Sequence, residues 1–408
     1  MSKNVLDFIR ENWDNTVRVH TEDEGTRIGL PNPYTVPCIA GTFQELYYWD
    51  TYFTNVGLLL SNRADLAIGN VENIAAMIHR FGKMPNGSRT HFLNRSQPPF
   101  FSQMVRDIYD IVGDATWLGE IYGALEKEYA FWQNERQTAQ GLNRYTGDLN
   151  TPADYELYCR ELCDRFGFDW PAEEATQREY AACMVSFCES GWDCNSRFGL
   201  EAHRFAPVEL NALLYGLETN MAYFAAVLKN GEEALWHDRS AARRRRMDDM
   251  MWDDDRGMYC DVQIETGAKS NFVSVAAFYP LFFGLCTDAQ AAVTVKLLPR
   301  LENRYGVACS EQREGLLELQ WDHPHGWACL QYMTIGGLLR YGYTEDARRI
   351  AAKYIEVVDR NYETTGSLWE KYDTVSGKVS VTKEYESPQM MGWSAGVYLY
   401  CTALVKDR

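Results

Sequence analysis

Acidic side chains next to tryptophans mark four short segments of this sequence as candidates for chemistry. These segments are 43–53, 189–198, 320–327 and 369–373, and a fifth polar segment, 85–100, lacks such a pair. Aromatic neighbours remove water from a carboxyl group and favour its neutral form, whereas cationic or donor neighbours favour the anion. Glycoside hydrolysis needs both forms, because one carboxylic acid protonates the leaving oxygen while one carboxylate activates water.

Two of these carboxyls have neighbours that suit the two roles. Asp193 follows Gly191 and Trp192, and the glycine allows the backbone to bend tightly into a pocket. Glu370 precedes Lys371, whose ammonium group favours an ionised carboxylate. For a single Trp-Asp pair, an ordinary helix end with Asp as the cap is the more common explanation. The four pairs in these segments weaken that explanation, but their spacing leaves open which carboxyls meet.

Helices are the main elements expected to position these residues. Apolar residues recur every three or four positions, most clearly over 208–228. Similar periodicity predicts helices near 5–17, 45–61, 64–81, 99–112, 115–135, 272–286, 327–341, 344–360 and 392–405. Residues 370–386 are typical of a short β-hairpin with Ser376-Gly377 at its turn.

A loose internal repeat predicts how these helices assemble. Trp132, Trp252 and Trp369 each precede a polar stretch, a glycine and a short extended piece. A single helix pair cannot bury its apolar face alone, so about six such pairs predict a closed all-α ring, an (α/α)6 toroid, with a helical solenoid as the alternative. No Pro-, Ser- or Gly-rich linker divides the chain, and we expect one catalytic domain over residues 1–408.

Composition excludes several classes of partner. The net charge of −17 argues against nucleic acid and against anionic membrane surfaces, since both need clustered Lys and Arg. No stretch reaches the roughly 18 uninterrupted apolar residues of a membrane span. The eleven scattered cysteines are expected to be reduced and buried, and the first residues lack the apolar run of an export signal. These features predict a cytoplasmic protein.

Other clusters of charged or metal-binding residue types have simpler explanations. The arginine run 243–246 is followed by several acids, which predicts a solvated helix face with ion pairs rather than a nucleic-acid patch. His323 and His325, or Cys159 and Cys163, fall short of the four convergent ligands of a zinc site. We therefore expect no metal, no cofactor and a small-molecule glycoside as the ligand, with the oligomeric state left open.

Five blocks of the sequence resemble the trehalases of glycoside hydrolase family 37, in the order in which the family has them. The blocks are 45–53, 94–99, 189–193, 320–327 and 370–373, and the resemblance spans about residues 35 to 400. It implies an (α/α)6 toroid and hydrolysis with inversion at the anomeric carbon. It also implies that Asp193 is the general acid and Glu370 the general base.

The same resemblance implies a set of sugar contacts around the two carboxyls. Glu384, for example, stands nine residues before Trp393, as a sugar-binding glutamate does in the family. The expected contacts are Phe43, Tyr47, Trp49, Asp50, Asn86, Arg95, Gln97, Gly191, Trp192, Gln320, Trp321, Asp322, Glu384 and Trp393.

Departures from the family pattern concern substrate recognition. Thr42 stands where the family has an arginine, and the stretch 150–155, where a second is expected, has no arginine before Arg160. The segment 380–383 replaces a glycine-rich run. A lost guanidinium removes charge-assisted hydrogen bonds worth about 1.5–3 kcal/mol each. The sequence thus predicts preserved chemistry with altered recognition of the second glucose.

The sequence is compatible with three alternative functions. Hydrolysis of trehalose to glucose is the principal one. The alternative is hydrolysis of another α-glycoside such as glucosylglycerate or mannosylglycerate, as in compact hydrolases of the related family 63. A catalytically inactive carbohydrate-binding protein is the third, and the presence of both carboxyls disfavours it.

Overall fold

The computed structural model describes residues 4–315, 319–382 and 385–406, and most of them are helical. The helices are α1 (Val5–Asn12), α2 (Tyr48–Leu60), α3 (Ala64–Phe81), α4 (Phe101–Val112), α5 (Ala115–Glu135), α6 (Pro152–Phe166), α7 (Glu174–Ser190), α8 (Val208–Leu228), α9 (Glu233–Met250), α10 (Tyr279–Phe282), α11 (Asp288–Thr294), α12 (Leu298–Leu301), α13 (Ala328–Arg340), α14 (Thr344–Thr365) and α15 (Gly392–Lys406). The strands are β1 (Val17–Arg18), β2 (Tyr34–Thr35), β3 (Phe205–Ala206), β4 (Trp252–Asp253), β5 (Met258–Tyr259), β6 (Val262–Gln263), β7 (Glu302–Asn303), β8 (Gly306–Val307), β9 (His325–Trp327) and β10 (Lys371–Asp373).

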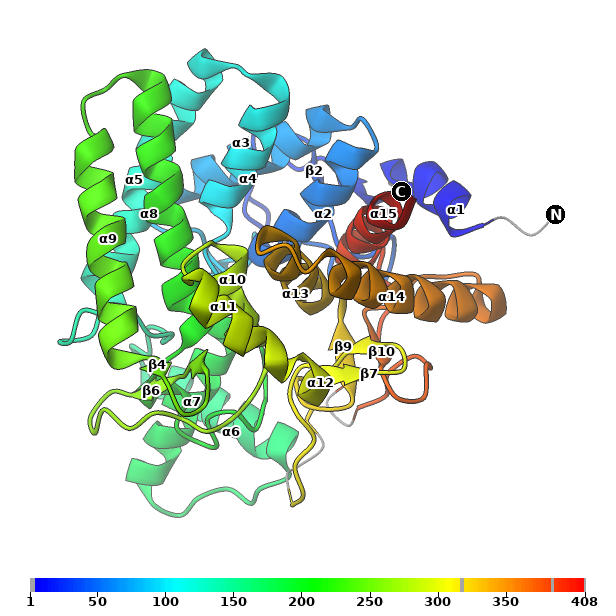
Figure 1. The fold of residues 1–408 in the computed structure, drawn as a ribbon. Helices are drawn as coiled ribbons and strands as arrows, with labels where there is room; N and C mark the ends of the chain where they lie inside the picture. The colour runs from blue at the N-terminus through cyan, green and yellow to red at the C-terminus, as the bar shows by residue number, and fades with distance from the viewer. Residues whose placement is uncertain (1–3, 316–318, 383–384, 407–408) are drawn as a thin grey trace.

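Within the described residues, six helices form a closed inner ring. Each of α2, α4, α8, α10, α13 and α15 packs against the next, and α15 packs against α2. Helices α3, α5, α9 and α14 connect successive members of this ring and pack outside them (Figure 1). This arrangement confirms the predicted (α/α)6 toroid.

The apolar pattern of each helix explains its place in the ring. Inner helix α8 is buried almost all round, including Leu210, Leu213 and Leu217, as expected for a helix without a polar face. Outer helix α14 buries only one stripe, from Ala347 through Ile350 and beyond, and its other face carries charged residues.

Glycines allow the closest approach within the ring, between α2 and α15. A Cβ atom added to Gly396 would lie 2.0 Å from the Phe53 carbonyl oxygen, and one added to Gly57 would lie 2.5 Å from the Gly396 Cα atom. These separations are far below a normal van der Waals contact, so both positions exclude larger residues.

Helices α6 and α7 form a hairpin that is additional to the ring. They pack mainly against each other and build a separate apolar cluster that includes Leu162, Phe166 and Phe187. The prediction of one domain therefore stays a prediction. Figure 1 shows this hairpin at the same end of the molecule as most of the short strands.

The sequence did not predict α6 or α7, and it placed the arginine run on a helix face, now seen as part of α9, whose surroundings differ from the expectation. Arg243 is 1% exposed, and its Nε atom donates to Glu218 of α8 at 2.9 Å. The prediction of a solvated face is wrong at this position, because α9 packs along α8 and Glu218 provides the charge partner there.

The predicted hairpin over 370–386 is present as a tight turn, but its first strand has a second partner. The Asp373 amide donates to the Lys378 carbonyl across the turn. The longer antiparallel pairing joins β10 to β9, with Lys371 opposite Trp327. This pairing ties the segment that carries Glu370 to the inner helix that follows β9.

The eleven cysteines all lie within the described residues, where they are buried and form no disulfides. Among the described helices none is long and apolar enough to cross a bilayer. No cluster of three or more metal-binding side chains occurs in the described ranges.

We expect Gly396→Ala to lower the free energy of unfolding by about 1–3 kcal/mol, because the added methyl group overpacks the α2–α15 contact. Chemical denaturation monitored by circular dichroism measures this change. Gly119→Ala on α5 is the matched control, since its added Cβ would meet only the Leu228 side chain at 3.7 Å. The control should raise stability by about 0.5–1 kcal/mol through helix propensity, and equal effects of the two substitutions would contradict the packing argument.

Candidate active site

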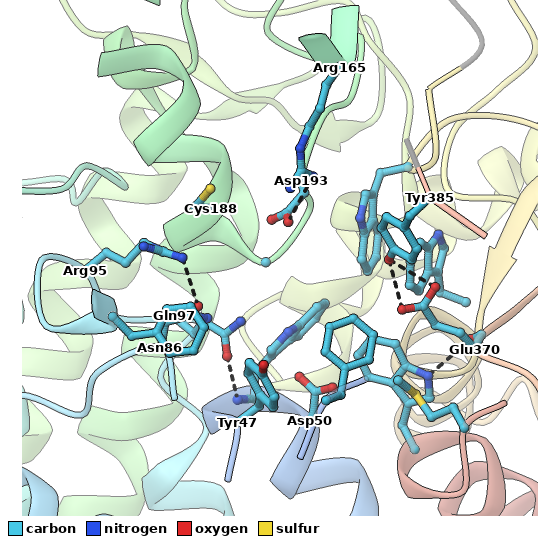
Figure 2. Close-up of a pocket in the computed structure, with 18 of the residues that line it drawn as sticks. Tyr47, Asp50, Asn86, Arg95, Gln97, Arg165, Cys188, Asp193, Glu370 and Tyr385 are labelled. Carbon is cyan, nitrogen blue, oxygen red and sulfur yellow. Dashed lines mark hydrogen bonds and ion pairs between the residues drawn. The ribbon is translucent and has the colours of Figure 1, made fainter. Parts of the chain in front are cut away.

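Most of the predicted site residues line one pocket of about 240 Å³ at the strand-bearing end of the ring (Figure 2). The predicted residues in its lining are Phe43, Tyr47, Trp49, Asp50, Asn86, Arg95, Gln97, Gly191, Asp193, Trp321, Glu370 and Trp393. Segments far apart in the sequence therefore converge as the five family-like blocks suggest. Glu384 lies outside the described residues.

A glycine turn brings Asp193 to the pocket. Helix α7 ends at Gly191, whose φ of 72° lies in the left-handed region. A Cβ atom there would lie 2.7 Å from the Trp49 ring. Both the backbone conformation and the close approach to Trp49 require glycine, so this turn fixes where Asp193 enters the pocket.

The surroundings of Asp193 raise the pKa of its carboxyl group towards neutral pH. Burial raises the pKa of Asp193 to about 6, and the charge of Arg165 acts against this rise. The Arg165 Nη1 atom lies 3.5 Å from Asp193 Oδ2. Such a group is protonated in part of the molecules near pH 6 and can donate that proton.

Glu370 lies immediately before β10 and has donors on both carboxylate oxygens. The Lys371 ammonium group donates to Oε2 at 2.6 Å, and the Tyr385 hydroxyl group lies 2.9 Å from Oε1 and 3.0 Å from Oε2. Burial raises the pKa of Glu370, whereas the charge of Lys371 and both hydrogen bonds oppose that rise. The donors thus favour an anion in a buried place.

Asp50, in the first turn of α2, is the third carboxyl group of the pocket. Burial raises its pKa to about 8, with a further contribution from the charges of Glu370 and Asp193. Asp50 is therefore mainly neutral at pH 7, which limits the negative charge that the pocket must hold.

Tryptophan rings form an apolar wall beside the carboxyls. Trp321 stacks on Trp327 with ring centroids 3.8 Å apart, and Trp393 meets Trp327 edge-on at 5.6 Å. Trp49 packs against both Trp321 and Trp393. Aromatic faces of this kind pack against the apolar C–H faces of sugar rings.

Polar donors line the opposite side of the pocket. The Arg95 guanidinium donates to the Tyr158 hydroxyl at 2.6 Å and to Asn86 Oδ1 at 3.2 Å. Gln97 accepts a hydrogen bond from the Trp49 backbone amide at 3.3 Å. These contacts fix the three side chains before any ligand binds.

Three predicted contacts, Trp192, Gln320 and Asp322, lie outside the pocket lining. Trp192 stacks behind Trp321 at 5.7 Å. Both carboxylate oxygens of Asp322 lie within hydrogen-bonding distance of the Ser196 amide, at 3.1 and 3.0 Å. Asp322 thus holds the loop that follows Asp193, and the expected contact of these three residues with the sugar stays a prediction.

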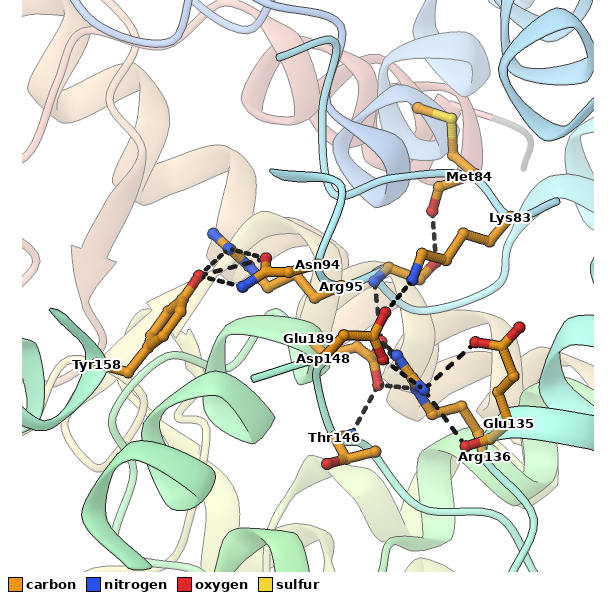
Figure 3. Close-up of polar contacts among 11 residues, drawn as sticks. Lys83, Met84, Asn94, Arg95, Glu135, Arg136, Thr146, Asp148, Tyr158 and Glu189 are labelled. Carbon is orange, nitrogen blue, oxygen red and sulfur yellow. Dashed lines mark hydrogen bonds and ion pairs between the residues drawn. The ribbon is translucent and has the colours of Figure 1, made fainter. Parts of the chain in front are cut away.

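A buried ionic network centred on Glu189 and Arg136 lies near the chain segment that carries Arg95 (Figure 3). Glu189, in the last turn of α7, is fully buried and pairs with Arg136 at 3.0 Å. Its carboxylate also accepts hydrogen bonds from the Ser96 and Thr146 amides at 2.9 and 2.7 Å. Glu189 therefore ties the end of α7 to the loop that carries Arg95 and Gln97.

Sequence reasoning missed seven residues of the pocket lining. They are Phe92, Glu161, Arg165, Cys188, Trp327, Tyr385 and Met390. The most important is Arg165, because no arginine was expected on this side of the pocket. The stretch 150–155 has none, but α6 brings Arg165 to the pocket from farther along the chain. A helix prediction over α6 would have placed Glu161 and Arg165 on one face, four residues apart.

Comparison with known proteins agrees with this arrangement. The family profile described as Trehalase matches residues 3–405. The periplasmic trehalase of Xanthomonas axonopodis pv. citri is 34% identical over 95% of this chain and 71% of its own length. The putative periplasmic trehalase of Salmonella typhi is 33% identical over 92% of this chain and 69% of its own.

Solved structures show the same fold. Neutral trehalase from Saccharomyces cerevisiae matches with a TM-score of 0.80 and 26% identity, over 98% of this chain and 80% of that one. The family 63 mannosylglycerate hydrolase of Thermus thermophilus, in its complex with glucose, matches with a TM-score of 0.70 and 16% identity, over 98% and 100%. The second match is a likeness of fold alone.

The comparisons overturn the predicted location and settle the family. The expectation of a cytoplasmic protein is wrong, because the curated relatives are named periplasmic trehalases, which points to the periplasm. The profile match over nearly the whole chain, together with relatives above 30% identity, shows that the chain belongs to the trehalase family.

Proposed function

We propose that this chain hydrolyses trehalose to two molecules of glucose with inversion, using Asp193 as the general acid and Glu370 as the general base. As a member of the trehalase family the chain is a glycoside hydrolase. The observation that supports the two roles is the contrast between these carboxyls in one pocket. Burial raises the pKa of Asp193 to about 6, whereas Lys371 and Tyr385 donate to Glu370.

The reaction needs one water molecule and two proton transfers. Glu370 accepts a proton as the water oxygen bonds to the anomeric carbon, while Asp193 donates its proton to the glycosidic oxygen as the bond from that oxygen to the anomeric carbon breaks. The attacked glucose takes the β configuration, and the departing glucose keeps the α configuration. Loss of a proton from Glu370 and gain of one by Asp193 restore the starting state.

The pocket walls supply binding groups for a neutral sugar. The rings of Trp49, Trp321 and Trp393 offer apolar faces, and Arg95 offers donors to hydroxyl groups. Mainly neutral Asp50 can both donate and accept a hydrogen bond. The family 63 alternative substrates rest on a likeness of fold alone, and a screen of trehalose, glucosylglycerate and mannosylglycerate tests the choice directly.

Replacement of the two carboxyls should separate their roles. We expect Asp193→Asn and Glu370→Gln each to lower kcat on trehalose by about 10²–10⁴-fold, the usual contribution of general acid–base catalysis. With α-glucosyl fluoride, whose leaving group needs no proton, Asp193→Asn should regain most of its activity and Glu370→Gln should not. Steady-state kinetics on both substrates measures this difference.

Asp50→Asn is the decisive comparison, because Asp50 has the higher pKa of the two candidate acids. If Asp50→Asn is rescued by the fluoride and Asp193→Asn is not, the acid has been assigned to the wrong residue. Asp249→Asn and Glu120→Gln, at exposed positions outside the pocket, are matched controls that should retain full activity.

Inversion predicts which anomers appear first. Proton NMR during the first minutes of trehalose hydrolysis should show α- and β-glucose in equal amounts, before mutarotation mixes them. A retaining enzyme would release only α-glucose, so an initial excess of the α anomer would rule out the inverting mechanism.

The dependence of kcat/KM on pH should identify the protonated acid. Asp193 must carry its proton, so we expect kcat/KM to fall as pH rises through about 6. The acidic limb reports protonation of Glu370, which abolishes its action as a base. A falling limb near pH 8 instead would point to Asp50, and this outcome would count against Asp193 as the acid.

A further inference from the structure

One nitrogen of the Arg165 guanidinium has no hydrogen-bond acceptor among the described residues. Its Nη2 atom donates to Glu161 on the same helix at 2.6 Å. Its Nη1 atom lies 3.5 Å from Asp193 Oδ2, and it is buried without a hydrogen-bond partner among the described residues. A buried donor left without an acceptor is costly, typically about 1–3 kcal/mol, so this atom is a candidate for ligand binding.

The position of Arg165 defines which part of the substrate it can reach. In an inverting hydrolysis the water attacks from the side of the base, and the departing sugar lies on the side of the acid. Figure 2 shows Arg165 approaching Asp193 from the side away from Glu370. Arg165 and Glu161 both line the pocket, and they therefore border the space beside the acid.

We propose that Arg165, held by Glu161, binds a hydroxyl group of the leaving-group sugar and positions Asp193, an assignment that rests on the proposed function. The guanidinium provides donors and the carboxylate of Glu161 an acceptor, and together they match neighbouring hydroxyl groups. Since Glu161 already balances the charge of Arg165, the site selects a neutral leaving group over a carboxylate. Arg165 thus does for the leaving sugar what an arginine in the stretch 150–155 would have done.

Several charged groups face Asp193, and Arg165 has the strongest effect among them. The charged neighbours are Arg165 and Glu161 from α6, Arg95 and Glu370, and the mainly neutral titratable neighbours are Asp50, Cys188 and Tyr385. The two arginines lower the pKa of Asp193, whereas the acidic groups raise it together with burial. Removal of Arg165 should therefore raise the pKa of Asp193.

Kinetics of Arg165→Gln on two substrates tests the contact with the leaving group. We expect kcat/KM to fall about 10- to 100-fold on trehalose, the size of one charge-assisted hydrogen bond. The same variant should retain kcat/KM within about threefold on α-glucosyl fluoride, which has no leaving sugar and needs no acid. Equal losses of kcat/KM on both substrates would overturn the proposed contact between Arg165 and the leaving sugar. The proposed function would still stand in that case, provided that the unaltered protein hydrolyses trehalose.

Helix α6 contains its own matched control. Arg160 forms the same type of ion pair with Glu156 four residues earlier, at 2.9 Å, but is 58% exposed. Arg160→Gln should leave both substrates unaffected. Arg165→Lys retains the positive charge but lacks the paired N–H donors of the guanidinium group. We therefore expect its kcat/KM on trehalose to be lower, while the alkaline limb of its pH profile stays at the same pH.

A titration that needs no substrate tests the effect on Asp193. Carbon NMR of protein labelled at its aspartate carboxyls, with the Asp193 signal assigned through Asp193→Asn, should give a higher pKa in Arg165→Gln than in the unaltered protein. An unchanged pKa would overturn the coupling of Arg165 to Asp193 whatever the substrate is. If the unaltered protein leaves trehalose intact, the proposed function and the contact with the leaving sugar fall together.

Discussion

The burial of several carboxyl groups around one small pocket is the constraint on which the rest of this structure depends. Water that would otherwise stabilise their charges is largely excluded from Glu370 and Asp50, and it still reaches the Asp193 side chain, which is 33% exposed. The protonation state of each carboxyl therefore depends strongly on its protein neighbours. Glu370 has a lysine and a tyrosine as donors, whereas Asp193 has an arginine at a longer distance. Asp50 has neither and becomes neutral most easily. Three acids of similar intrinsic strength thereby acquire different properties.

Each positively charged side chain near these carboxyls is supplied by a different part of the fold. The pairing of β9 with β10 places Lys371 opposite Trp327, whose ring lies 4.7 Å from the Lys371 ammonium group. Hydrogen bonds from Arg95 to Tyr158 and Asn86 hold this arginine at the opposite wall. The hairpin of α6 and α7 supplies the third cation. The ring thus fixes the position of the pocket, and the segments between its helices supply the positively charged side chains around it.

The ring could be predicted from the sequence because most of its helices are long and rich in apolar residues, as α8 shows. The pairing of Trp with Asp or Glu likewise identified Asp50, Asp193 and Glu370, which all lie in the pocket. Spacing gave no information on which way a side chain points, so Trp192 and Asp322 were expected in the lining but lie behind it. Helix α6 is rich in charged residues and has a weaker apolar pattern, and for this reason Arg165 was missed. Tyr385 lies between Glu384 and Glu386 but belongs to no pair of tryptophan and acid, and only the folded chain brings its hydroxyl group to Glu370.

The separate apolar cluster of α6 and α7 has a consequence for how such an enzyme can diverge. Residues on the pocket side of α6 can change without disturbing the packing of the ring, since the hairpin is held together largely by its own side chains. The base and the tryptophan wall belong to the ring and its strands, whereas the arginine beside the acid belongs to the hairpin. The base is therefore held by the ring and its strands, whereas the acid, which follows α7, and the arginine beside it are held by the hairpin, so this chain can vary its leaving-group side while keeping the base in place.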